Sequence, residues 1–288
     1  MMEKRKNNIF VAFALISTGI LIALIALIMV GFDFERLNDE HTEKKNYTTS
    51  ENIDSIIVSS DVSKVNIKKT AGDTCRVEYV VSNKTRINVT LENGTLEIKE
   101  KDKRKWYDFV RFSFLTSYNY KINIYLPEDQ YESLKVRTDT GSIRVDSISV
   151  KEKIKLEADT GSVDVENLTC EELICDVDTG HIDIDDINSD AVALSTDTGS
   201  ISAKDTIVKG HFKASTDTGS VKINDIEADT IDIKTDTGSI KGTVYGPMIF
   251  KAKTDTGSIN VPDSDEGGLC NLKTDTGSIK VKYSNKSR

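Results

Sequence analysis

A four-residue motif recurs at a nearly fixed spacing through the second half of the chain. The motif is Asp-Thr-Gly-Ser, with His in place of Ser at one position, and it occurs eight times. Its aspartates are Asp139, Asp159, Asp178, Asp197, Asp217, Asp236, Asp255 and Asp275. A constant period of about 20 residues indicates stacked structural repeats.

Apolar residues keep a constant position relative to each motif aspartate. They occur five and three residues before it and four residues after it, and the residue six after it is mostly Val, Ile or Ala. Charged and small polar residues fill most positions between them. This alternation predicts two short strands, one on either side of each Asp-Thr-Gly corner.

Two β architectures use such a unit. In an antiparallel meander, a Thr-Gly loop would put threonine at positive φ, and a three-residue loop would turn the two apolar rows to opposite faces. In a solenoid both rows point into one core, and glycine supplies the positive φ of a type II corner. We therefore expect an all-β fold, a parallel β-solenoid of about eight coils of 19–20 residues with a β-rich N-terminal cap.

Asp-Thr-Gly also surrounds the catalytic carboxylates of aspartic proteases. Those enzymes need two aspartates that share a proton across one cleft, whereas this chain repeats the motif in every coil. We predict instead that each aspartate caps its turn by accepting hydrogen bonds from backbone N–H groups. The sequence thus predicts no catalytic residue, no cofactor and no enzyme activity. Calcium bound along the aspartate column is an alternative, although the glycine-rich nonapeptide spacing of calcium-binding repeats is missing.

The segment from Ile9 to Phe32 carries no charged side chain. As a helix it would be roughly 36 Å long, enough to span a bilayer. A cleaved signal peptide is the competing interpretation, but the apolar run is long and bulky residues follow it. With Lys4, Arg5 and Lys6 before it, the segment predicts an uncleaved single-pass cell-membrane anchor, a cytoplasmic N-terminus and an extracytoplasmic body.

Net charge and the cysteine positions indicate which partners and which thiol chemistry to expect for the body, residues 33–288. The net charge is −9, and residues 1–32 contribute +2, so the remainder carries −11, which argues against nucleic acid as a partner. The four cysteines show no metal-site spacing, and we predict no metal ligand among them. Cys175 and Cys270 occupy apolar positions of the repeat and should be buried. For Cys75 and Cys170 a disulfide stays an open alternative.

The expected domains follow one another along the chain. They are a basic tail (1–8), the anchor (9–32), a polar linker (33–51), a β-rich cap (52–135), the solenoid (136–284) and a short tail (285–288). Within the cap, Glu-Asn-Gly-Thr between two alternating runs predicts a β-hairpin.

The stretch "KINIYLPEDQYESLKVRTDTGSIRV" contains a strand, a Leu-Pro pair, a second strand and the first of the repeated corners. Together with the later corners, over roughly residues 50–284, it resembles the bacterial "putative adhesin" β-strand-repeat family. The resemblance implies a membrane-attached or exported bacterial protein, sometimes linked to cell-envelope stress responses. It carries over no catalytic residue.

Two sets of residues are candidates for binding. Outward positions two before and five after the aspartates change along the chain from acidic (Glu157, Asp164, Asp176 and Asp183) to basic. The basic set, a candidate contact for an anionic wall polymer, consists of Lys222, Lys234, Lys241, Lys253, Lys273 and Lys280. A second set interleaves basic and aromatic residues and is a candidate membrane or wall contact, unless its aromatic residues pack under the cap: Lys103, Arg104, Lys105, Trp106, Tyr107 and Phe109.

Three functions are compatible with these features. We favour a non-enzymatic, membrane-anchored solenoid outside the cell that acts as an adhesin or as a binding or structural module of the cell envelope. The alternative is an accessory or regulatory protein of an envelope stress response that acts through a membrane partner. A carbohydrate-active solenoid enzyme ranks last, because the repeats contain few aromatic residues for sugar subsites.

Overall fold

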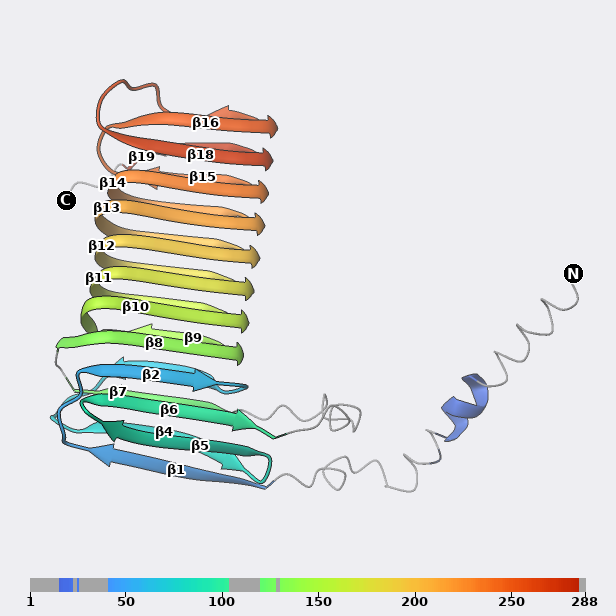
Figure 1. Ribbon diagram of the computed structural model, residues 1–288. Coiled ribbons are helices and arrows are strands. Elements are labelled where there is room, and N and C mark those ends of the chain that lie inside the picture. Colours follow the sequence, from blue (N-terminus) through green and yellow to red (C-terminus); the bar gives the residue numbers. More distant parts are fainter. Residues whose placement is uncertain (1–15, 23–24, 26–40, 104–119, 128–129, 285–288) are drawn as a thin grey trace, which may run out of the picture. The chain divides into compact units, whose positions relative to one another are not determined.

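The computed structural model describes residues 16–22, 25, 41–103, 120–127 and 130–284. The chain divides into two units, residues 1–41 with 104–118, and residues 42–103 with 119–288. In the first unit residues 16–22 are helical, and no helix among the described residues has the length and apolarity of a membrane span. Most of the expected anchor, residues 9–32, lies outside the described residues. All nineteen strands of the described chain belong to the second unit (Figure 1).

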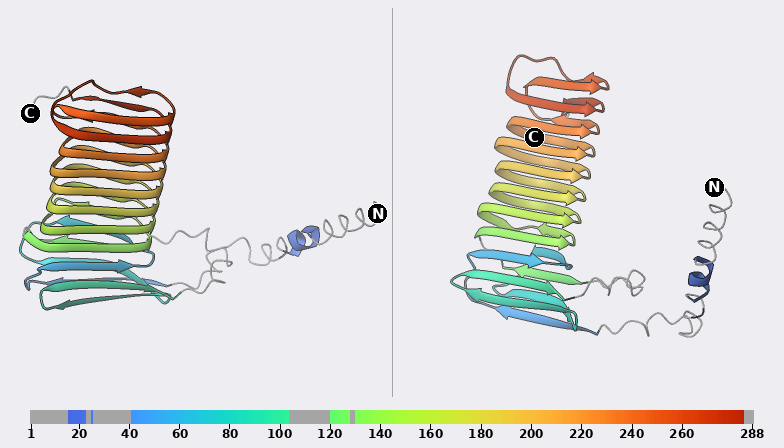
Figure 2. Two further views of the ribbon diagram at one scale, coloured as in Figure 1. Left: turned by 45° about the horizontal axis from the view of Figure 1, so that its top comes forward. Right: turned by 45° about the vertical axis from the view of Figure 1, so that its right-hand side comes forward.

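Parallel strands stacked one above the next form the middle of the second unit (Figures 1 and 2). These strands are β8 (Gln130–Thr140), β9 (Ile143–Asp146), β10 (Ser149–Thr160), β11 (Val163–Thr179), β12 (Ile182–Thr198), β13 (Ile201–Thr218) and β14 (Val221–Thr237). Paired residues lie one period of the repeat apart, as Leu173 and Val192 do. This is the arrangement of a parallel β-solenoid, as the repeat predicts, and an antiparallel meander is excluded for these strands.

Each coil has a first side, which follows the motif glycine, and a second side, which precedes the next motif. A second corner joins the two sides, and there one residue adopts a left-handed backbone with φ between 45° and 60°. These residues are Ser147, Asn167, Asp186, Asp205 and Asp225. Asparagine and aspartate tolerate this conformation better than other residues with a side chain. Apolar alternation gives no sign of this corner, although its five positions recur with the same period as the motif.

The core lies between the two sides and consists of the apolar rows that the repeat predicts. Residues at the inward positions are buried from Leu134 in β8 to Val281 near the end of the chain. The exceptions lie in the C-terminal coils, where Ile259 is 45% exposed and Phe250 and Ala252 are only partly buried. Because each fully buried apolar side chain contributes about 1.5–3 kcal/mol, stability comes from the stack and not from a single coil.

Backbone hydrogen bonds between neighbouring coils hold the Asp-Thr-Gly corner. The N–H of Gly180 donates to the carbonyl oxygen of Thr198 at 2.9 Å, and equivalent bonds recur along the stack. From Gly161 onward the motif glycines have φ between 146° and 158°. The predicted positive φ is therefore confirmed, but the type II geometry, with φ of about 80°, is wrong. The carbonyl oxygen of the adjacent motif glycine occupies the space of a Cβ atom, so close stacking sets this backbone.

The motif aspartates stand at these corners but do not cap them as predicted. Within the described part of the chain, none of the eight carboxylates accepts a hydrogen bond from a backbone N–H group. The partners of Asp139, Asp159, Asp236, Asp255 and Asp275 are cationic side chains, as when Arg137 donates to Asp159 at 2.9 Å. The threonine directly before the aspartate bonds the corner in later coils, where the hydroxyl of Thr216 donates to the carbonyl oxygen of Gly199 at 2.9 Å. The backbone groups of the corner thus form their hydrogen bonds with glycine and threonine, and the carboxylate is left for side-chain partners.

Antiparallel strands close the N-terminal end of the stack. The strands of this end are β1 (Thr42–Thr49), β2 (Ser55–Ser60), β3 (Lys64–Lys69), β4 (Cys75–Ser82), β5 (Thr85–Glu92), β6 (Thr95–Asp102) and β7 (Lys121–Leu126). β2 and β3 form a first coil that pairs in parallel with β8 and β9. β5 and β6 form the predicted hairpin, with Asn93 and Gly94 both at positive φ.

The linker prediction is wrong for residues 42–49, which form β1. This strand pairs antiparallel with β4 at the edge of the sheet. Its side chains are exposed except for Tyr47 and Thr49. An edge strand can be mostly polar because its backbone hydrogen bonds, and not an apolar face, attach it to the sheet. A pattern search based on apolar alternation therefore misses it.

The C-terminal coils are not stacked in chain order. Their strands are β15 (Ile240–Val244), β16 (Met248–Thr256), β17 (Ile259–Asn260), β18 (Gly268–Thr276) and β19 (Ile279–Tyr283). β18 lies between β14 and β16 (Figure 1). On the other side of the coil, β19 lies between β15 and β17. The chain thus runs outward through β16 and β17 and then returns to insert its last two strands. β16 and β17 are left at the edge, which accounts for the exposure of Ile259.

All four cysteines are buried and unpaired. Cys175 and Cys270 fill core positions, as predicted from the repeat. Cys75 and Cys170, for which a disulfide was left open, are both free in the structure.

Candidate functional site

Charged side chains flank the Asp-Thr-Gly corners in two outward columns, one on each side of the coil. In stacking order the second-side column consists of Arg137, Glu157, Asp176, Ser195, Ser215, Lys234, Lys273 and Lys253. The first-side column consists of Arg144, Asp164, Asp183, Ser202, Lys222, Lys241, Lys280 and Asn260. After an arginine at the first position, both columns change from acidic to basic along the stack, as the sequence predicts, and serines separate the two sections.

The structure brings the six predicted lysines together as two neighbouring columns of three. Because β18 and β19 insert into the stack, Lys273 lies between Lys234 and Lys253. For the same reason Lys241 lies between Lys222 and Lys280. Adjacent strands are about 4.8 Å apart, so each column stacks like charges at short range.

The two lysine columns differ in their partners. On the second side, each lysine contacts the aspartate two residues later, at 3.0 Å for Lys234, 3.4 Å for Lys273 and 3.8 Å for Lys253. The hydrogen bond to its aspartate raises the pKa of Lys234. The lysines of the first-side column, Lys222, Lys241 and Lys280, are exposed and have no ion-pair partner among the described residues. The lysines of the first-side column are therefore available to a ligand.

A groove with a volume of about 290 Å³ lies over the acidic section of the first side. Carboxylates from two neighbouring coils line it, and the register pairs Asp164 with Asp183 and Glu166 with Asp185. Arg144 donates to Glu166 at 3.1 Å, and Lys204 donates to Asp185 at 2.8 Å. One pair of carboxylates is thus matched by permanent cations.

The second side of the acidic section is also crowded with negative charge. Burial, followed by the neighbouring charges of Asp178 and Glu157, raises the pKa of the Asp176 carboxyl. Burial and the nearby Asp159 and Asp61 raise the pKa of Asp139 in the same way.

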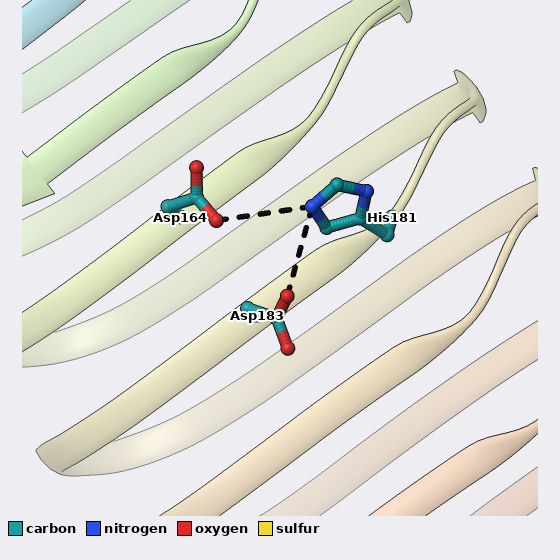
Figure 3. Close-up of side chains that lie close together, drawn as sticks. All are labelled: Asp164, His181 and Asp183. Atoms are coloured by element: carbon teal, nitrogen blue, oxygen red, sulfur yellow. Dashed lines mark ion pairs between the residues drawn. The ribbon is translucent and has the colours of Figure 1, made fainter.

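The only histidine of the repeated motif, His181, stands beside the unmatched carboxylates (Figure 3). Its Nε2 atom lies 4.0 Å from Oδ1 of Asp164 and 3.7 Å from Oδ2 of Asp183. Its Nδ1 atom lies 3.0 Å from Oγ of Ser162 on the adjacent coil. His181 was not among the predicted site residues, although its replacement of the usual serine was a signal in the sequence.

The second predicted set falls almost entirely outside the described residues. Only Lys103 is described, and it is exposed, with its N–H donating to the carbonyl oxygen of Lys84 at 2.7 Å. The others, Arg104, Lys105, Trp106, Tyr107 and Phe109, lie outside the described part. Their contact with membrane or wall stays a prediction.

Comparisons with known proteins bear on the fold more than on the site. A family model described as Toastrack DUF4097 matches residues 53–280. No curated protein matches the chain. The crystal structure of a "putative adhesin" from Bacteroides fragilis NCTC 9343 is similar, with 15% identity, a TM-score of 0.51, and coverage of 85% of this chain and 97% of that one. This similarity supports a shared fold.

Two structures from Parabacteroides distasonis ATCC 8503 are more distant. One is a "putative adhesin" with 13% identity, a TM-score of 0.47, and coverage of 85% of this chain and 98% of that one. The other is a "Putative lipid binding protein" with 12% identity, a TM-score of 0.37, and coverage of 85% and 97%.

Proposed function

The chain belongs to the Toastrack DUF4097 family, and from this premise we propose that it is a non-enzymatic, adhesin-like module of the cell envelope that binds an anionic polymer. The proposed binding surface is the basic section of the solenoid. The chain is held at the cell membrane by residues 9–32, and its body lies outside the cytoplasm. The uncharged apolar segment and the basic residues before it support this placement.

The observation that carries the proposal is the column of Lys222, Lys241 and Lys280. Three like charges on successive strands repel one another, and this costs stability unless a counter-charge offsets it. The parallel column on the second side has such a counter-charge in its own aspartates. The first-side column has none within the described residues. A polymer with regularly spaced phosphate or carboxylate groups would supply it along the whole column.

A charge-matched comparison tests this surface. In one variant of the full chain, Lys222, Lys241 and Lys280 are replaced by Gln. In the control, Lys44, Lys64 and Lys151, which are exposed on other strands, are replaced by Gln. Both variants lose three positive charges, so a difference between them reports position and not net charge.

The readout is retention of the detergent-solubilised protein on purified cell-wall and membrane fractions. We expect the column variant to bind at least about tenfold more weakly than the wild type, and the control to bind normally. Retention should also fall as salt rises, because salt screens exposed charges. Equal retention of all three proteins would contradict the proposal.

Placement of the body outside the cytoplasm is tested on intact cells. Protease added from outside should degrade the solenoid while a cytoplasmic marker protein stays intact. A solenoid that is degraded only after the cells are lysed would contradict the proposed orientation.

A further inference from the structure

We propose that Asp164, His181 and Asp183 form a binding site for a divalent first-row transition metal ion such as Zn²⁺. The site joins two coils of the solenoid, and its two aspartates line the acidic groove. Ser202 separates Asp183 from Lys222, the first lysine of the first-side column.

The three donor atoms already face one another. Nε2 of His181 and one carboxylate oxygen from each aspartate lie within 4.8 Å of one another. The two pairs that include Nε2 are 4.0 Å and 3.7 Å long. Two ligands of a tetrahedral zinc ion, each about 2.1 Å from the metal, are about 3.4 Å apart. Small rotations of three half-exposed side chains would close that difference.

Ser162 orients the histidine for this role. Its hydroxyl lies 3.0 Å from Nδ1 of His181, which leaves Nε2 directed at the two aspartates (Figure 3). Histidine ligands usually donate the N–H of their second nitrogen to such a partner. With a metal on Nε2, the Nδ1–H of His181 would donate to Oγ of Ser162, and this bond would hold the ring orientation. The serine comes from the neighbouring coil, so the stack itself aligns the imidazole.

The local charge calls for a cation at this position. Asp164 and Asp183 are register partners, and like charges directly opposite each other on adjacent strands are destabilising. One row further along, Glu166 and Asp185 are offset by Arg144 and Lys204. Arg144 is the register partner of Asp164 on its other side, but its guanidinium is paired with Glu166. Among the described residues, neither Asp164 nor Asp183 forms an ion pair with a lysine or arginine. A divalent ion would neutralise both carboxylates at once.

The donor set selects the class of metal. One imidazole nitrogen and two carboxylate oxygens suit zinc and its first-row neighbours. Calcium and magnesium prefer ligand shells made only of oxygen, so the histidine argues against them. The half-exposed position leaves room for water as a fourth ligand.

The repeat supplies a conservative way to remove the site. Seven of the eight motifs have serine at the position of His181, so this corner accepts serine without a change of backbone. His181→Ser therefore deletes one ligand in a coil that still matches its neighbours. His211 is exposed and does not line this groove. Its Nδ1 atom lies 2.7 Å from Oγ1 of Thr230, and His211→Ser is the matched control.

Calorimetric titration of the detergent-solubilised full chain with ZnCl₂ tests the proposal. We expect one zinc ion per wild-type chain, an affinity reduced at least about tenfold in His181→Ser and Asp164→Asn, and no change in His211→Ser. Titration with Co²⁺ should give a ligand-field absorption band that His181→Ser lacks. Equal zinc affinity in the wild type and His181→Ser would overturn the proposal, as would failure of the wild type to bind zinc at millimolar concentration.

Discussion

The carbonyl oxygen of Gly180 occupies the place where residue 199 would put its Cβ atom if it were not glycine. Gly199 also has φ of 151°, a conformation that residues with a side chain rarely adopt. We therefore expect Gly199→Ala to lower the free energy of unfolding by about 2–5 kcal/mol through overlap and backbone strain. Denaturant unfolding followed by circular dichroism measures this change.

The neighbouring residue provides the control for that substitution. Ser200 is exposed, and its hydroxyl makes one long hydrogen bond of 3.4 Å with the N–H of Ser220. Ser200→Ala should change stability by no more than about 0.5 kcal/mol. If Gly199→Ala changes the free energy of unfolding as little as Ser200→Ala does, close stacking of the corners does not require glycine at position 199.

The second corner makes a different demand on its residue. Asp186 is exposed and has φ of 53°. A β-branched side chain is strained in this left-handed conformation, so Asp186→Val should cost about 1–2 kcal/mol. Asp186→Gly should be neutral or slightly stabilising, because glycine adopts this φ freely. Thermal unfolding of both variants checks the order, and a valine variant as stable as the glycine variant would contradict it.

Burial of the four thiols predicts a loss of stability at alkaline pH. Burial raises the pKa of Cys75 and Cys170 to about 11 and that of Cys270 to about 12, and it raises the pKa of Cys175 as well. As the pH rises above 9.0, the ordinary thiol value, the unfolded chain loses protons that the folded chain keeps. Rising pH therefore favours unfolding between about pH 9 and 12, and the denaturation midpoint should fall across this window.

A double substitution separates the thiols from other alkaline effects. Valine or a similar apolar residue fills the equivalent core positions in other coils, so Cys175→Val with Cys270→Val should fold normally. Its denaturation midpoint should fall clearly less between about pH 9 and 12 than that of the wild type.

The same burial should make all four wild-type thiols react at least about a hundredfold more slowly with a thiol reagent at pH 8 than they do in denaturant. A rapidly reacting thiol in the folded chain would show that one of them is accessible.

The order of the last coils predicts the effect of a truncation. β16 pairs only with β18, and β17 pairs only with β19, among the described strands. A chain that ends after Gly267 should therefore lose the order of β16 and β17 as well, and trypsin should cut it readily at Lys251 and Lys253. A chain that ends after Ser284 should resist cleavage at these sites. Mass spectrometry of the products decides, and equal resistance of both chains would mean that β16 does not depend on β18.

Sequence reasoning predicted the middle of the molecule well because one constraint governs it. A short constant period with inward apolar rows is compatible with few folds, and the structure has those rows buried from Leu134 onward. The change of charge along the two outward columns also followed from the period. The type II corner and the aspartate caps were wrong, because both were argued from isolated turns. In the stack, the carbonyl oxygen of the neighbouring glycine sets the conformation, and this contact between coils is invisible in the local sequence.

The departures from sequence prediction share a physical reason, since each depends on contacts across strands far apart in the chain. Glu100 is buried at 4% exposure because it accepts hydrogen bonds from Ser60, Ser63 and two backbone N–H groups of a distant segment. The place of β18 between β14 and β16 follows from the return of the chain and not from the repeat. His181 stands out in the sequence as the one departure from serine, but its place beside Asp164 and Asp183 depends on the register between two coils.

The insertion of β18 and β19 next to β14 and β15 also restricts how such a protein can change in length during evolution. A duplicated repeat placed among β10 to β14 finds a like neighbour above and below, so every pairing in the molecule is kept. The same duplication at the end of the chain would separate β18 and β19 from the strands that receive them. Related proteins with longer or shorter stacks should therefore differ by whole coils gained or lost in the interior, while the strand order at both ends of the stack stays the same.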